Sequence, residues 1–150
     1  MDLAPSQRFE PVTQFSIFAT NRIGKLNELM QVLACNSVHI AAITTIDTSE
    51  AGLFRIVVDY PEAARRTLED GGFPFVEHRV FAVEVASEQA IAQVCAAMTE
   101  AELNILYLYS FLMRPNGRSG LVICVDDNDL ASQVLFAHGF KVLCQQDIAR

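Results

Sequence analysis

The sequence lacks any apolar run long enough to cross a bilayer. Its most apolar stretch, from Ile105 to Met113, is far shorter than the roughly 20 residues that a membrane-spanning helix needs. The opening residues, MDLAPSQRFEPVTQ, contain no apolar core of signal-peptide length. We therefore expect a cytoplasmic protein with no membrane partner.

Basic residues are in deficit. The chain has 11 Lys and Arg against 18 Asp and Glu, which gives a formal net charge of -7. A negative surface field repels phosphate backbones, so we expect no nucleic-acid partner. A hydrophobic fraction of 51% with 19% charged residues is typical of a chain that packs a core, and it excludes a disordered protein.

The cysteines form no C-x-x-C pair and have no neighbouring histidine at metal-ligand spacing; they are Cys35, Cys95, Cys124 and Cys144. Their even number leaves disulfides open. Cys95, however, falls on the apolar stripe of an expected helix, and Cys124 lies in the strand-like run LVICV. Free cysteine behaves as a small hydrophobic residue at such positions, so the sequence favours buried, unpaired thiols.

Signatures of catalysis are also missing. No nucleophile stands beside a base, no pair of carboxylates occupies an apolar setting, and no phosphate-binding loop occurs. The acidic run DDNDL at 126–130 lacks the glycine and the final glutamate of an EF-hand loop, and a solvated turn that starts a helix explains it better. We expect no enzyme, no cofactor and no bound metal.

An internal repeat is present instead. FRIVVDYPEAARRTLEDGGF (54–73) aligns without gaps on LVICVDDNDLASQVLFAHGF (121–140), and 7 of the 20 positions are identical. The identical pairs are Ile56 and Ile123, Val58 and Val125, Asp59 and Asp126, Ala64 and Ala131, Leu68 and Leu135, Gly72 and Gly139, and Phe73 and Phe140. Upstream, FSIFAT (15–20) corresponds to FAVEVA (81–86). The chain therefore contains one structural unit twice.

Each unit reads as strand, helix, strand, strand, helix, strand. FSIFAT and FAVEVA alternate as half-buried strands do, and the next segments carry apolar stripes at helical spacing, namely Leu26, Leu29, Met30 and Leu33, then Ile91, Val94, Cys95 and Met98. Pro61 suits the first turn of the second helix, Gly71 and Gly72 end it, and Gly139 ends its copy. Asp59 and Asp126 are interpreted most simply as helix caps.

This order predicts an α+β fold made of two ferredoxin-like βαββαβ units. Each unit should form a four-stranded antiparallel sheet with two helices on one face. The first spans residues 12–78 and the second 79–148, with no Gly/Ser-rich or Pro-rich linker between them. We therefore expect the two units to pack tightly together.

Two segments resemble the ACT family of small-molecule-binding regulatory domains, in its stand-alone tandem form. TNRIGKLNELMQVLACNSVHI (20–40) resembles the family's D-x-P-G-x-L loop, helix and N-I strand opening; Gly24 and Leu26 match, whereas Asn21, Ile23 and His39 depart from it. AELNILYLYSF (101–111) resembles the I-N-I-x-Y-L-Y-x-F stretch of tandem ACT proteins. The resemblance implies an amino-acid-binding sensor, related to regulatory subunits of amino-acid biosynthesis enzymes.

The glycine of the first loop has a physical role apart from the family name. A helix that begins at about Ile23 exposes backbone N–H groups with partial positive charge, and Gly24 lets a carboxylate approach them without a side chain in the way. Asn21 can cap this helix or offer its oxygen to an α-ammonium group, while the strand at Val38 to Ile40 supplies carbonyls. Gly24 can equally serve a tight turn alone. The second loop, ASEQAI, has no glycine and is interpreted as a degenerate copy.

The resemblance places the ligand at an interface between halves or subunits, with Tyr107 and Tyr109 lining it. The expected ligand-binding residues are Asn21, Arg22, Ile23, Gly24, Lys25, Leu26, Val38, His39, Ile40, Asn104, Tyr107 and Tyr109. A packing role for His39, and a core or dimer-interface role for the two tyrosines, stay open. The expected partners are an amino acid, a second copy of the chain and an enzyme of amino-acid metabolism. The alternative is a dimerising scaffold without a ligand.

Overall fold

The computed structural model describes residues 11–20, 23–47, 51–112 and 119–149. Helices and strands follow one another within them in the predicted order, with a short extra helix at the end. The elements are β1 (Val12–Thr20), α1 (Lys25–Cys35), β2 (Ile40–Asp47), β3 (Ala51–Val58), α2 (Pro61–Asp70), β4 (Phe75–Val85), α3 (Glu88–Glu100), β5 (Ile105–Ser110), β6 (Ser119–Val125), α4 (Asn128–Ala137), β7 (Val142–Leu143) and α5 (Gln145–Ile148). The first helix thus begins two residues later than expected.

The seven strands form one antiparallel sheet in the order β2-β3-β1-β4-β6-β5, and β7 pairs with β4. Strands β2, β3, β1 and β4 make the four-stranded sheet of the first unit. Strands β5, β6, β4 and β7 make that of the second unit. The predicted α+β fold with two βαββαβ units is therefore confirmed, with one strand common to both.

Strand β4 joins the two units without a turn. Its first part pairs with β1, from Phe75 opposite Ile17 to Val80 opposite Val12, and its second part pairs with β6, from Phe81 opposite Ile123. The last strand of one unit and the first strand of the next are therefore continuous. The expected division between residues 78 and 79 falls inside this strand, and as a domain boundary it stays a prediction.

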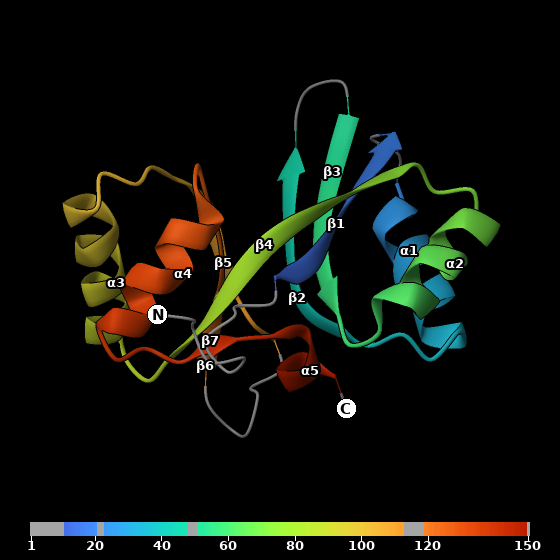
Figure 1. The fold of residues 1–150 in the computed structure, drawn as a ribbon. Helices are drawn as coiled ribbons and strands as arrows, with labels where there is room; N and C mark the ends of the chain where they lie inside the picture. Colours follow the sequence, from blue (N-terminus) through green and yellow to red (C-terminus); the bar gives the residue numbers. More distant parts are fainter. Residues whose placement is uncertain (1–10, 21–22, 48–50, 113–118, 150) are drawn as a thin grey trace.

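The four long helices lie on the two outer sides of the molecule. Figure 1 shows α1 and α2 on one side, α3 and α4 on the other, and the strands between them. Leu29 and Leu33 of α1 pack with Phe15 and Ile56 in the core of the first half. Val94 and Met98 of α3 belong to the core of the second half. The predicted stripes therefore face the sheet, except that Leu26 is 38% exposed.

A third core lies between the inner faces of the two half-sheets. Val57 from the first half, Tyr109 and Val122 from the second, and Ile148 of α5 contribute to it, all at most 8% exposed. The outer strands of the two halves also touch, because Ala42 and Phe111 form an isolated bridge and Leu112 N donates to Ala41 O at 2.6 Å. Tight packing of the halves follows from this shared interior.

Candidate functional site

The turn that contains Gly24 is open. Gly24 is the N-cap residue of α1 with φ +88°, provides no side-chain cap, and a Cβ added to it would meet nothing within 4 Å. Ile23 is fully exposed, and Lys25 Nζ lies 3.2 Å from Glu28 Oε2. Asn21 and Arg22 lie outside the described residues. The turn thus presents backbone to solvent beside charges of both signs.

Val38, His39 and Ile40 lie at the opposite end of α1. The helix has 11 residues, which corresponds to a length of roughly 16 Å. In a strand–helix–strand connection, the turn before the helix and the start of the next strand lie at opposite ends of the helix. The structure therefore does not bring the carbonyl acceptors expected at residues 38–40 and Gly24 into one site within a chain. Val38 is buried in the first core, and His39 O already accepts from Asp59 N at 3.1 Å.

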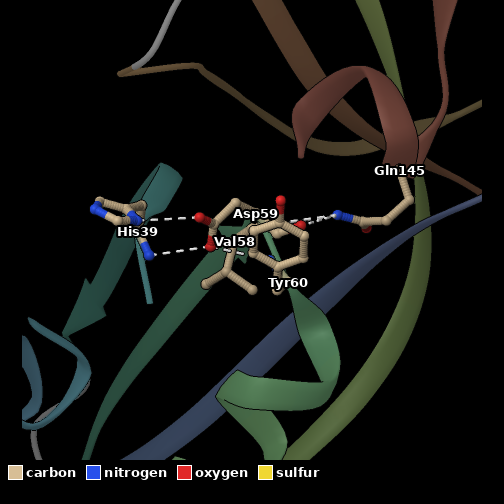
Figure 2. A network of polar contacts seen from close by, with 5 residues as sticks. All are labelled: His39, Val58, Asp59, Tyr60 and Gln145. Carbon is tan, nitrogen blue, oxygen red and sulfur yellow. Dashed lines mark hydrogen bonds and ion pairs between the residues drawn. The ribbon is translucent and has the colours of Figure 1, made fainter. Parts of the chain in front are cut away.

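Asp59 anchors the start of β2 (Figure 2). Its side chain is 1% exposed; Oδ1 accepts from His39 N at 3.0 Å and from Tyr60 N at 2.9 Å, and Oδ2 lies 3.1 Å from His39 Nδ1. In the second half, Asp126 Oδ1 accepts from Asn104 N at 3.1 Å, and Asn104 is exposed. Both aspartates therefore hold the beginning of a neighbouring strand.

The interpretation of these aspartates as helix caps is wrong. The N-cap residue of α2 is Tyr60, without a side-chain cap bond, and α4 is capped by Asp127, whose carboxylate accepts from Leu130 N at 3.0 Å. The carboxylates of Asp59 and Asp126 instead turn to a strand 20 and 22 residues earlier in the chain. Sequence spacing around a helix start could not reveal that long-range contact.

Gln145 of α5 links the second half to the first (Figure 2). Its Nε2 donates to Val58 O at 3.0 Å and Asp59 O at 3.3 Å, and its Oε1 accepts from Thr13 N at 3.2 Å. Beside it lies a cavity of about 670 Å³ between α2 and α5, within the usual range for small-molecule sites. Its lining comprises Thr13, Asp59, Tyr60, Pro61, Glu62, Ala63, Arg65, Arg66, Gln145, Gln146 and Ala149. Of the residues expected from the sequence, none that the structure describes lines it.

Tyr107 and Tyr109 belong to a polar cluster between the half-sheets. Gln14, which is fully buried, donates from Nε2 to Tyr107 Oη at 2.7 Å, and its Oε1 accepts from Tyr109 Oη at 2.6 Å. The guanidinium of Arg55 lies 3.8 Å from the centre of the Tyr107 ring. Burial raises the pKa of both tyrosines, so both hydroxyls stay protonated at neutral pH.

Sequence reasoning missed Arg55 and Gln14, although the repeat contains a signal for them. In the alignment of the two halves, Arg55 corresponds to Val122 and Gln14 to Val80. The strand pairing extends this correspondence to β2 and β5. Tyr107 pairs with Cys124 as Ala42 pairs with Val57, so Tyr107 takes the place of Ala42. Tyr109 pairs with Val122 as Thr44 pairs with Arg55, so Tyr109 takes the place of Thr44. The halves therefore differ where they face each other, with polar groups from one and aromatic groups from the other.

The described residues offer little for metal or disulfide chemistry. Within the ranges that the structure describes, no three His, Cys, Asp or Glu side chains are grouped to hold a metal ion. All four cysteines are free; Cys35 is exposed and the other three are partly buried. The thiols are therefore unpaired, as expected, but not fully buried. No described helix is long and apolar enough to cross a membrane.

Solved structures with the same fold include protein BT0572 from Bacteroides thetaiotaomicron, with a TM-score of 0.85 and 26% sequence identity over 95% of this chain and 98% of that one. The regulatory subunit of aspartate kinase from Thermus thermophilus, in its ligand-free form, has a TM-score of 0.60 and 13% identity over 87% and 94% of the two chains. The corresponding subunit from Thermus flavus has a TM-score of 0.57 and 14% identity over 87% and 93%. These last two likenesses show the fold.

No curated protein matches the chain. The sequence profile of the ACT domain pair matches residues 11–150, which include both units, and no catalytic domain is identified within that range. Together with the two βαββαβ units, this match establishes that the chain belongs to the ACT domain pair family.

Proposed function

We propose that this chain is a regulatory protein that binds an amino acid at the Gly24 turn. The observation that carries the proposal is the uncapped start of α1, where a left-handed glycine leaves the backbone open to solvent. A carboxylate at a helix N-terminus gains hydrogen bonds from free N–H groups and a favourable dipole. Lys25 and Glu28 beside the turn offer further contacts to the two charges of an amino acid.

The second half supports this assignment by contrast. The helix that corresponds to α1 is α3, and its N-cap residue Ser87 accepts a hydrogen bond from Ala90 N at 3.2 Å. That helix start satisfies one of its donors with its own side chain. The proposed ligand therefore binds the first half, and the second half serves as its structural counterpart. Tyr107 and Tyr109 then act in joining the halves through Gln14, and Asn104 stays within the second half on Asp126, both away from this turn.

The proposed partner is an enzyme of amino-acid metabolism. The Thermus proteins of the same fold are named as regulatory subunits of aspartate kinase, which supports a role in which ligand binding changes an association with a separate enzyme. In this role the ACT domain pair contributes control, and the partner contributes the chemistry. We further propose that two copies of the chain assemble.

A thermal-shift screen with the twenty amino acids tests the proposal. A ligand at about 100 times its dissociation constant stabilises a protein by about 2.7 kcal/mol, which raises the melting temperature of a domain this size by roughly 5 to 10 °C. The variant Gly24→Ala should lose most of this shift, because the added methyl group projects into the space from which the ligand approaches.

Gly139→Ala is the matched control. Gly139 has φ +86° and, like Gly24, no atom within 4 Å of an added Cβ, so both variants carry the same backbone strain. Only Gly24 lies at the proposed site. Equal ligand shifts in the two variants, or no shift with any amino acid in the wild type, would contradict the proposal.

The alternative function is a dimerising scaffold without a ligand. The observation that favours it is the outermost strand β5, where Leu106 is 56% and Leu108 is 38% exposed. Apolar side chains on an outer strand suit pairing with a second copy. A dimer in analytical ultracentrifugation that Leu106→Lys dissociates, combined with a negative amino-acid screen, would favour this function.

A further inference from the structure

Arg55 is a partly buried cation that has no counter-ion among the residues that the structure describes. Among the residues that the structure describes, its Nε is the one buried side-chain nitrogen or oxygen without a hydrogen-bond partner, and no described carboxylate forms an ion pair with it. The guanidinium carbon Cζ of Arg55 lies 3.8 Å from the centre of the Tyr107 ring. Burying an unpaired donor of a charged group is costly, so such an atom in a folded protein calls for a partner.

The strand register shows what lies around Arg55. Thr44, Ser16 and Val76 share its row across the sheet, on the inner face that is free of helices. The next row, away from the second half, brings Ile46, Leu53 and Phe18 to the same face. Phe18, Ile46, Leu53 and Val76 form what we call the apolar shelf; Phe18 is 46%, Val76 44% and Ile46 37% exposed.

Arg55 therefore stands at the inner end of an exposed apolar surface, with the Tyr107 ring against it. We propose that Arg55 binds the carboxylate of a small acid whose apolar tail covers the shelf. A planar guanidinium is well suited to holding a carboxylate through two parallel hydrogen bonds. The tail would remove part of the apolar surface from water.

The chemistry of the row defines the ligand further. Arg55, Thr44, Ser16 and the shelf include no acidic side chain that could hold an ammonium group. The site therefore prefers a simple carboxylic acid over the amino acid with the same side chain. It does not depend on the amino-acid site at Gly24, because α1 covers the opposite face of this half-sheet.

Isothermal titration calorimetry with three matched probes tests this proposal. They are 4-methylpentanoate, 4-methylpentan-1-ol, which lacks the carboxylate, and leucine, which adds the ammonium group. We expect the acid to bind and the alcohol to bind at least about tenfold more weakly, since a hydrogen-bonded charge pair is lost. Leucine should bind at the shelf more weakly than the acid. An alcohol that binds as well as the acid would overturn the role of Arg55.

Two variants locate the site. Arg55→Gln removes the charge and should weaken binding of the acid at least about tenfold, whereas Lys141→Gln removes the same charge from an exposed residue and should bind as the wild type does. Phe18→Ala changes an exposed shelf residue without opening the core, and it should weaken binding severalfold. Circular dichroism of each variant confirms that it is folded.

Three outcomes would overturn the proposal. One is unchanged binding in Arg55→Gln, and another is no detectable heat with millimolar acid and folded wild-type protein. The third is a dimer in ultracentrifugation that Phe18→Ala dissociates and the acid does not affect, because a second copy would then cover the shelf. Loss of binding in Arg55→Gln and Phe18→Ala, with Lys141→Gln unaffected, would support it.

Discussion

Replacing Asp59 by alanine should cost much more stability than the same change at Asp126, its partner in the repeat. Asp59 is 1% exposed and accepts hydrogen bonds from two backbone donors, His39 N and Tyr60 N. Asp126 is exposed and accepts one from Asn104 N. Each donor that loses its partner away from water costs about 1 to 3 kcal/mol.

The expected free-energy losses follow from these contacts. Asp59→Ala leaves two donors unsatisfied, which corresponds to about 3 kcal/mol, while the donor at Asp126 regains water and costs about 1 kcal/mol or less. Asp59→Asn keeps an oxygen at the same position and should recover more than half of the loss. The contact with the half-exposed His39 side chain adds little to either figure.

Urea denaturation followed by far-ultraviolet circular dichroism measures these differences. With a denaturant slope of about 2 kcal/mol per molar, a 2 kcal/mol difference between Asp59→Ala and Asp126→Ala separates their midpoints by about 1 M. The slopes themselves should agree, since both variants expose the same surface on unfolding. Coincident midpoints would refute the reasoning that burial, and not the shared position in the repeat, sets the cost.

Three further predictions concern tyrosine and glutamate. Tyr109→Phe leaves the buried Gln14 Oε1 without its donor and should cost about 1 to 3 kcal/mol in the same urea assay. In the wild type, stability should also fall as pH rises above about 10, because unfolded tyrosine ionises there while burial keeps Tyr109 neutral. The Arg65 hydrogen bond lowers the pKa of Glu77, so Glu77→Gln should cost under about 1 kcal/mol at pH 7. The difference in stability between Glu77→Gln and the wild type should vanish at low pH. It is lost as pH falls below 4.5, the ordinary pKa of glutamate, and then through the lower pKa that Glu77 has in the folded protein.

Much of the fold could be predicted because the repeat constrains each unit twice. The apolar spacing of Leu29 and Leu33, and again of Val94 and Met98, marks the buried helix faces. Gly72 and Gly139 both adopt positive φ after α2 and α4, as their place at the helix ends indicates. Local pattern and tertiary packing agree at these positions.

The site was less predictable because it depends on contacts between distant segments. Gln145 reaches Val58 across 87 residues and Tyr109 reaches Gln14 across 95, and no local pattern encodes such pairs. His39 lies far from Gly24 because the whole length of α1 separates them, whereas the expected site combined residues from both ends of this helix. Arg55 could have been recognised as a charged residue at a position where the other half has valine.

Because β4 runs unbroken through both half-sheets, its register sets which side chains enter both cores. Phe75 packs in the first core and Phe81 in the second, and both belong to the same strand. A slip by a single residue would turn both rings to the wrong face at once, because side chains alternate along a strand. Any motion that passes between the two halves must therefore twist or bend this strand, since sliding would disrupt both interiors together.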